Sequence, residues 1–176
     1  MENKFPDRKS PRFKDYDYDY NSPGYYFITI CVKNMVHVFG EIKNGKMILN
    51  KYGFIAERCL LDLPNHYNRC KIDHYVIMPN HVHVIIIIND CNRREGSATL
   101  PPNEQHGITE VLRGFKTFSS KEINNLLSPG KKFSWQKSFY DRIIRNEKEL
   151  YNIRKYIEQN PLKWEFEKNV PGNLFI

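Results

Sequence analysis

The fold prediction starts from one stretch of the sequence, His74-Tyr75-Val76-Ile77-Met78-Pro79-Asn80-His81-Val82-His83-Val84-Ile85-Ile86-Ile87-Ile88. Two apolar runs meet at Pro79-Asn80, which is typical of a short turn because proline presets φ and asparagine tolerates unusual backbone angles. The runs therefore predict two antiparallel strands, 71–78 and 81–88. The four consecutive isoleucines indicate that the second strand is central in its sheet and covered on both faces.

The second of these strands carries two histidines separated by one valine. Because side chains alternate between the two faces of a strand, His81 and His83 point to the same side. Two neutral imidazoles in this arrangement could be two ligands of one divalent ion. They could equally be a pair of hydrogen-bonded core histidines. As a catalytic metal site the pair is incomplete, because it needs a third protein ligand and open positions for phosphate oxygens.

The rest of the chain predicts a small mixed fold. Strands are expected at 25–32, at 36–42 as its hairpin partner, and at 46–49 after the Asn44-Gly45 turn. Helices are expected at 51–63 and 107–127 from their apolar spacing, with a mixed basic and aromatic segment at 131–145. The order predicts an α+β fold: a ferredoxin-like antiparallel sheet with helices packed on one face.

The final helix is expected from Asn146 to Asn160. Asn146 is a suitable N-cap, Glu149 can close a capping box, and Pro161 is expected to end the helix. The 176 residues suffice for one domain covering 1–176. Within it we expect a basic N-terminal arm (1–24), a flexible loop (90–105) and a C-terminal tail (162–176).

Composition restricts the possible partners. The net charge is +7 and the pI about 9.2, which favours nucleic acid first and an anionic membrane surface second, unless the chain is simply a basic protein. No window reaches the roughly 18 consecutive apolar residues of a membrane span. The N-terminus has no apolar signal core, so we expect a cytoplasmic location, nucleoid-associated when bound to DNA. The four cysteines form no CxxC pair, which excludes the usual structural zinc patterns.

Two polar residues of the final helix could complete a site with the histidines. Tyr156 and Asn160 are four residues apart and share one helix face, beside the buried stripe. The asparagine carbonyl is a suitable hard-cation ligand, and a phenol beside a metal-held phosphodiester is a potential nucleophile. The alternative is a buried tyrosine with a C-cap asparagine. Tyr140 and Tyr151 compete as nucleophiles, but Tyr151 is rotated about 140° from Tyr156 on an ideal helix.

Several basic and aromatic side chains could contact DNA. The candidates for phosphate contacts are Arg12, Lys116, Lys137, Arg142 and Arg145, each of which could also be a solvated surface charge. Trp135, Phe139 and Tyr140 could stack on bases, although core packing explains Trp135 and Phe139 at least as well.

These motifs together resemble a known family. Pro79-Asn80-His81-Val82-His83 resembles the histidine-hydrophobe-histidine (HUH) motif of single-tyrosine transposases, and Tyr156-Ile157-Glu158-Gln159-Asn160-Pro161 resembles their Tyr-x-x-x-Asn/Gln nucleophile helix. Further segments resemble the REP-associated tyrosine transposase branch: Arg8–Tyr18, Gly24–Cys31, Phe39–Ile42, Phe115–Thr117, Trp135-Gln136 and Arg142–Asn146.

The resemblance implies a metal-dependent single-stranded DNA nuclease and strand-transferase that acts near DNA hairpins. It implies that His81, His83 and Asn160, or Gln159 in place of Asn160, hold Mg²⁺ or Mn²⁺. Tyr156 would attack the scissile phosphate, forming a 5′-phosphotyrosine and releasing a 3′-hydroxyl. Two alternatives stay open: a domesticated hairpin-DNA-binding protein without turnover, and a metal-dependent hydrolase of a small phosphoester. Whether the protein is a monomer or a homodimer is also open.

Overall fold

The computed structural model describes residues 21–90 and 106–167 of the chain. Most of the expected N-terminal arm, nearly all of the loop at 90–105 and the end of the expected tail lie outside the described residues. The elements, in chain order, are β1 (Gly24–Cys31), η1 (Lys33–Met35), β2 (Gly40–Lys43), β3 (Lys46–Leu49), α1 (Lys51–Leu61), α2 (Leu63–His66), β4 (Cys70–Ile77), β5 (His81–Ile88), α3 (Ile108–Asn125), β6 (Tyr140–Ile144) and α4 (Glu147–Glu167).

The main sheet has the strand order β4-β5-β1-β6, and all neighbouring strands are antiparallel. In the chain, α1 lies between β1 and β4, and α3 lies between β5 and β6. This is the β-α-β-β-α-β order of a ferredoxin-like fold. The predicted α+β class and ferredoxin-like antiparallel sheet are therefore confirmed, and β5 is central, as its isoleucines predicted.

The second predicted strand differs from its prediction in length and in partner. The strand expected at 36–42 begins only at Gly40, and it pairs with β3 and not with β1. Both edges of β1 are already taken by β5 and β6. Positive φ angles at Asn34 and Met35 turn the chain away after β1. The Asn44-Gly45 turn is confirmed, with φ of 53° and 68°.

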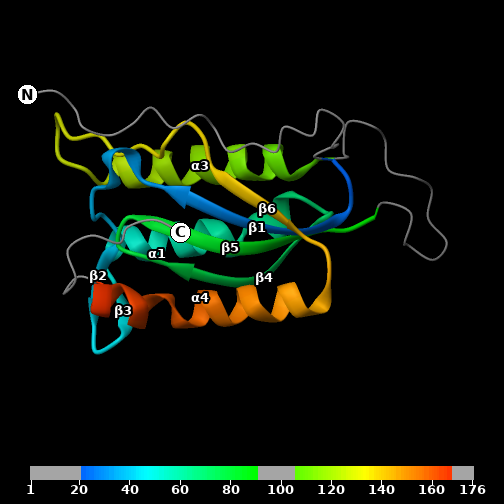
Figure 1. The fold of residues 1–176 in the computed structure, drawn as a ribbon. Coiled ribbons are helices and arrows are strands. Elements are labelled where there is room, and N and C mark those ends of the chain that lie inside the picture. The colour runs from blue at the N-terminus through cyan, green and yellow to red at the C-terminus, as the bar shows by residue number, and fades with distance from the viewer. Residues whose placement is uncertain (1–20, 91–105, 168–176) are drawn as a thin grey trace, which may run out of the picture.

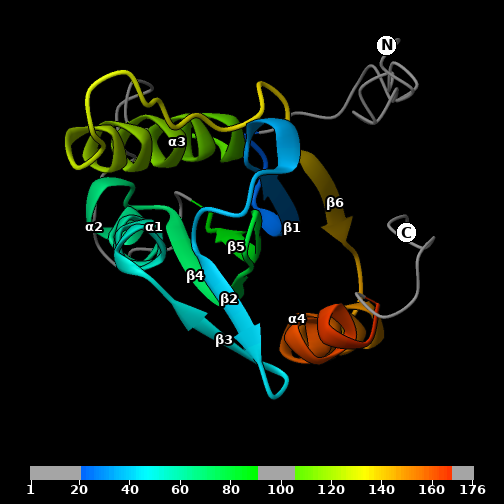
Figure 2. The same cartoon turned by 90° about the vertical axis from the view of Figure 1, so that its left-hand side faces the viewer.

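The main sheet is covered on both faces. One face packs on α1 and α3 through a large apolar cluster that contains Tyr26, Ile28 and Ile30 of β1. The opposite face packs on α4, whose Leu150, Ile153 and Ile157 form a smaller cluster with Ile85 and Ile144. Figures 1 and 2 show α3 and α4 on opposite sides of the sheet.

The expectation that the helices pack on one face holds for α1 and α3 and is wrong for α4. The physical reason lies in the composition of β5. Its isoleucines and valines are apolar on both faces, so each face needs a cover. The helix that follows β6 supplies the second one.

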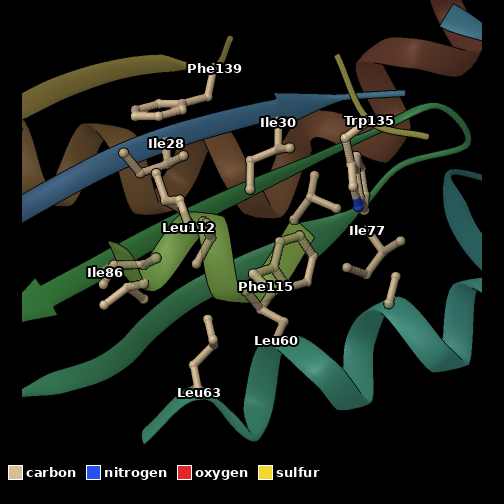
Figure 3. Packing of buried hydrophobic residues seen from close by; sticks show 14 of the residues in the cluster. Ile28, Ile30, Leu60, Leu63, Ile77, Ile86, Leu112, Phe115, Trp135 and Phe139 are labelled. Atoms are coloured by element: carbon tan, nitrogen blue, oxygen red, sulfur yellow. The ribbon is translucent and has the colours of Figure 1, made fainter. Parts of the chain in front are cut away.

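The cluster between the sheet and helices α1 and α3 is the main core. Figure 3 shows Phe115 of α3 and Leu60 of α1 packed against Ile28, Ile77 and other sheet residues. Trp135 and Phe139 belong to this core, so packing and not base stacking accounts for both side chains. The Trp135 indole N–H donates to the Ser119 hydroxyl at 2.9 Å, which satisfies its polar atom.

The segment before α4 contains a strand that the sequence did not predict. β6 pairs with β1, opposite to the side on which β5 pairs. At the start of α4 the predicted N-cap is confirmed, because the Asn146 Oδ1 accepts the Glu149 N–H at 2.9 Å. The Glu149 carboxylate accepts the Arg145 N–H at 3.0 Å, one residue earlier than in a standard capping box.

Helix α4 does not end at Pro161 but continues to Glu167, so the expected start of the tail at 162 is wrong. A proline inside a helix removes one backbone hydrogen bond. Contacts of the next turn offset this loss. The Glu165 carboxylate accepts the backbone N–H groups of Asn44 and Gly45, at 3.0 and 2.5 Å, and Leu162 lies against Gly45. The hairpin β2–β3 therefore holds the extension of α4.

Candidate functional site

The histidine pair lies at the start of β5, on the face that α4 covers. His81 and His83 are 8% and 6% exposed, and their Nε2 atoms are 3.1 Å apart. The ladder register places Thr29 of β1 directly opposite His83. The two rings meet nearly edge to face, with centroids 4.6 Å apart. The period-two prediction that both imidazoles share one face is thus confirmed by the geometry.

Neighbouring side chains fix the orientation of both rings. The Asn80 amide donates its Nδ2 hydrogen to the Met35 carbonyl at 3.0 Å, so its Oδ1 faces His81 and accepts the Nδ1 hydrogen at 2.7 Å. The lone pair of His81 is therefore on Nε2. The Thr29 hydroxyl lies 2.7 Å from Nδ1 of His83.

This network satisfies the pair as it stands. With the His81 Nε2 as an acceptor, His83 donates its Nε2 hydrogen, and the Thr29 hydroxyl donates to Nδ1 of His83. A hydroxyl can also accept a hydrogen bond. If Thr29 accepts from Nδ1, both Nε2 lone pairs become available on the same side. Thr29 therefore permits either tautomer of His83.

Burial keeps both imidazoles uncharged. Removal from water lowers the pKa of His81 to about 4, with a smaller contribution from His37. The same loss of hydration lowers the pKa of His83 well below its usual value, helped by His81. Both rings are neutral near pH 7, which is the form that binds metal ions.

The helix α4 brings Tyr156 to this pair. Its ring lies 5.3 Å from that of His83, centroid to centroid, and 6.0 Å from that of Phe27, which itself stacks on His83. Tyr156 is half-buried, whereas Tyr151 is 64% exposed on the outside of the same helix. The competing nucleophile Tyr151 thus points away from the histidines. Tyr140 lies on β6, separated from His83 by β1.

Asn160 faces the pair by its place on the helix. Two turns beyond Tyr156, the Trp164 ring lies 5.6 Å from that of His81. Residues four apart share a helix face, so Asn160 lies on α4 between Tyr156, which contacts His83, and Trp164, which contacts His81. It is 7% exposed, whereas its neighbour Gln159 is exposed. The structure therefore brings Tyr156 to His83 and places the buried Asn160 on the same face of α4.

A bidentate ion pair locks α4 against the edge strand β4. Arg154 donates from Nε and a terminal nitrogen to the two Asp73 oxygens, at 2.8 and 2.5 Å. The register of β4 shifts between Ile72 and His74, so Asp73 sits in a bulge. The hydrogen bonds from Arg154 hold the pKa of Asp73 below its usual value. Asp73 is therefore charged at neutral pH.

The basic candidates fall into different environments. Lys116 donates to the carbonyl oxygens of Gln136, Lys137 and Ser138, at 3.0 to 3.4 Å, so it holds that loop. The Lys137 and Arg145 side chains are exposed. Arg142 lies opposite Phe27, on the histidine face of the sheet, and pairs with Glu149 at 2.6 Å. Arg12 lies outside the described residues.

The donor set fits a small divalent site with amide and water ligands. Two nitrogens that bind one ion at about 2.0–2.1 Å, with an angle between about 90° and 109°, lie about 2.8–3.4 Å apart, which includes the observed Nε2 separation. Over residues 21–90 and 106–167, no group of three or more His, Cys, Asp or Glu side chains could hold a metal ion. Among the described residues, the amide of Asn160 is a candidate for a third protein ligand.

Sequence reasoning missed several residues of this region, among them Phe27, which packs against His83 and Tyr156. Asn80, Thr29 and Trp164 contact the histidines, and Lys163 lies over Tyr156. Asn80 could have been found, since it adjoins His81 in the turn. Thr29 depends on the strand register, and Trp164 and Lys163 depend on the helix continuing past Pro161. In the part of the chain that the structure describes, no helix is long and apolar enough to span a bilayer.

Comparison with known proteins gives a family and a fold. No protein-family model matches the sequence. A Haemophilus influenzae protein described as an uncharacterized protein is 36% identical over 171 residues, covering 90% of each chain. The chain belongs to the same family as this protein. A solved structure of a REP-associated tyrosine transposase bound to a REP hairpin superposes with a TM-score of 0.57, at 20% identity over 85% of this chain and 73% of that one.

This similarity establishes a shared fold. The chain shares its antiparallel α+β fold with that transposase, in agreement with the predicted fold class.

Proposed function

We propose that this protein cleaves and rejoins single-stranded DNA near hairpins, through a covalent bond to Tyr156. The observation that carries the proposal is the position of Tyr156 against His83, on the one face of the sheet that bears both histidines. Hairpin DNA is proposed as the substrate because the transposase that shares this fold was solved bound to a REP hairpin.

His81, His83 and Asn160 would hold Mg²⁺ or Mn²⁺ in this proposal. The bound cation would polarise the scissile phosphate and offset its charge. The chain's own residues prepare the site in three ways. Asn80 and Thr29 orient the imidazoles, burial keeps the imidazoles neutral, and Phe27 packs against both His83 and Tyr156.

The proposed step is an exchange of one phosphodiester for another. The Tyr156 Oη attacks the phosphorus, a Tyr–O–P bond forms, and the bond between phosphorus and the 3′ oxygen breaks. The phenol loses its proton to solvent, and the departing 3′ oxygen takes one up as a hydroxyl. Because the number of phosphate esters is unchanged, the reverse attack by a 3′-hydroxyl reseals the strand without another energy source.

Positive charge supplies the general affinity for the DNA backbone. The net charge of +7 favours binding of a polyanion, and DNA binding should weaken as the salt concentration rises. Lys137, Arg142 and Arg145 follow one another along the segment that contains β6, and Arg142 points to the histidine face. We propose this segment as the wall along which the strand approaches Tyr156.

The test is covalent trapping. Host genomic DNA is sheared, heat-denatured, snap-cooled so that hairpins form, end-labelled and incubated with the protein and Mn²⁺. Wild-type protein should form an adduct that survives denaturant, and sequencing the attached ends identifies the cleaved site. Tyr156→Phe should abolish the adduct, a loss of at least about 1,000-fold. Tyr151→Phe, an exposed tyrosine on the same helix, is the matched control and should keep full yield.

A second candidate is a hairpin-DNA-binding protein without turnover. It is favoured by the histidine network, which is fully hydrogen-bonded without a metal ion. This candidate predicts retention of the same DNA pool with no denaturation-resistant adduct in Mn²⁺ or Mg²⁺. An adduct that forms equally well in Tyr156→Phe would instead show that another residue is the nucleophile.

A further inference from the structure

The extension of α4 beyond Pro161 brings a cation to the candidate nucleophile. The Lys163 ammonium lies 5.3 Å from the centroid of the Tyr156 ring. Lys163 lies outside the Tyr-x-x-x-Asn motif, seven residues after the tyrosine. Residues seven apart return to the same helix face after two turns. The continued helix therefore places a positive charge at the rim of the site.

The sheet side chains whose rings contact Tyr156 carry no charge. From the sheet, the ring meets Phe27, which is apolar, and His83, which is neutral. Among the described residues no carboxylate forms an ion pair with Lys163, whereas Arg154, two residues before Tyr156, is engaged by Asp73. The Lys163 ammonium is therefore available to an anion that reaches Tyr156.

The indole N–H of Trp164, beside the histidine pair, is a second group that an anion could contact. The Nε1 of Trp164 is buried and has no hydrogen-bond acceptor within the described part of the chain. An indole N–H can only donate, and a buried donor without an acceptor is unfavourable. The Trp164 ring packs between those of His81 and His37, with centroids at 5.6 and 5.7 Å. An anionic oxygen entering this region would satisfy the donor.

We propose that Lys163 binds the phosphate that Tyr156 attacks and remains on that phosphate in the phosphotyrosine. This inference rests on the proposed function. An ammonium on a non-bridging oxygen offsets the negative charge that the attacking phenol brings to the phosphorus. Since the same phosphate is present before and after transfer, Lys163 acts in both cleavage and rejoining.

The test separates this role from general attraction of DNA. The probe is the snap-cooled, labelled genomic DNA pool with Mn²⁺, and adduct formation is followed over a range of DNA concentrations. Lys163→Met removes the charge and keeps the length of the side chain, and Lys163→Arg keeps the charge. Lys148→Met is the matched control: it removes an equal charge from the exposed first turn of α4, about 22 Å away along the helix.

Lys163→Met should lower the maximal rate of adduct formation about 10- to 100-fold. The half-saturating DNA concentration should change no more than in Lys148→Met. Rejoining, measured when excess 3′-hydroxyl strand is added to purified adduct, should slow by a similar factor. Lys163→Arg should restore most of both rates. Melting followed by circular dichroism checks that all variants fold.

Each other outcome overturns the inference. Equal maximal rates in Lys163→Met and Lys148→Met would show that Lys163 does not touch the reacting phosphate. A raised half-saturating concentration with an unchanged maximal rate would make it a general DNA contact. If wild-type protein forms no adduct, the proposed function fails and takes this inference with it. An adduct in wild type that is insensitive to Lys163 refutes the inference alone.

Discussion

The two faces of the central sheet differ in what they are made of, although the same strands build both. On the face toward α1 and α3, β5 presents Val82, Val84 and Ile86 to a continuous apolar core. On the face toward α4, the same strand presents His81 and His83, and only Ile85 joins an apolar cluster. Alternation along one strand thus separates a stabilising surface from a chemical one.

The two faces of the sheet also differ in how their covering helices are attached. Helices α1 and α3 are held mainly by buried apolar side chains such as Leu60 and Phe115 (Figure 3). Helix α4 has a smaller apolar cluster and adds several polar links to the rest of the fold: Arg154 to Asp73 and Glu158 to His74 on β4, Glu149 to Arg142 on β6, and Glu165 to the tip of the β2–β3 hairpin. The face that carries the chemistry therefore depends more on directional contacts than on buried area.

The largest expected effect separates stability from activity. Phe115 is fully buried between the sheet and Trp135. Phe115→Ala should lower the free energy of unfolding by about 3–5 kcal/mol, because it removes a large ring and leaves a cavity. Tyr156→Phe, on the other face, should change the free energy of unfolding by less than about 0.5 kcal/mol and should abolish the DNA adduct. Denaturant unfolding of both variants measures the contrast.

Equal losses of stability in these two variants would show that the two faces of the sheet contribute to stability in the same way. That result would mean that the Tyr156 hydroxyl is part of the structural core. Phe118→Ala is the control for the core variant, since Phe118 lies on the same helix but is 50% exposed. It should cost about 1 kcal/mol or less.

Lowering the pH should decrease the free energy of unfolding by an intermediate amount. Burial lowers the pKa of His81 to about 4 and that of His83 well below its usual value. In the unfolded chain both return to about 6.5. Stability is therefore complete above about pH 6.5 and falls as the pH decreases, because the unfolded state then binds protons that the folded state refuses. Between pH 7 and pH 5 the free energy of unfolding of the metal-free protein in EDTA should fall by about 2–4 kcal/mol.

The double variant His81→Gln/His83→Gln tests whether this loss belongs to the chemical face. Glutamine does not titrate in this range, so most of the decline between pH 7 and pH 5 should disappear. The other described histidines, such as His66 and His74, lie next to carboxylates and remain in both proteins. An unchanged decline in the double variant would assign the acid sensitivity to groups outside the buried pair.

The sequence predicted the features that depend on local pattern. Alternation placed His81 and His83 on one face, helical spacing placed Tyr156 and Asn160 on one face, and Asn44-Gly45 marked a turn. Each follows from the periodicity of a single element or from turn chemistry. That Tyr156 and His83 belong to one site was implied by the family resemblance. In the structure their ring centroids are 5.3 Å apart.

The features that depend on tertiary contacts were not predictable in the same way. Pro161 is a helix breaker locally, but the contacts of Glu165 and Trp164 sustain the helix beyond it. The position of α4 on the second face follows from β5 needing two covers, which its isoleucines indicated but did not assign to a helix. Strand β6 has basic and polar residues among its apolar ones, so its pattern alone does not mark a strand.

The smallest effect compares one ion pair on each face. Arg154 pairs with Asp73 between α4 and β4, and its partner is only 13% exposed. Arg58 pairs with Glu122 between α1 and α3, where the two side chains are 67% and 41% exposed. Arg154→Met should lower the free energy of unfolding by about 1–2 kcal/mol, because it strands a mostly buried carboxylate. Arg58→Met removes the same charge and should cost less than about 0.5 kcal/mol.

The same two variants should differ in chemistry. Because Arg154 fixes the helix that carries Tyr156, Arg154→Met should slow adduct formation several-fold at saturating DNA. Arg58→Met should leave that rate unchanged. If both variants lose stability equally and neither slows the adduct, the Arg154–Asp73 pair does not help to hold α4 in place. The attachment of α4 would then rest on its apolar cluster and its other polar links.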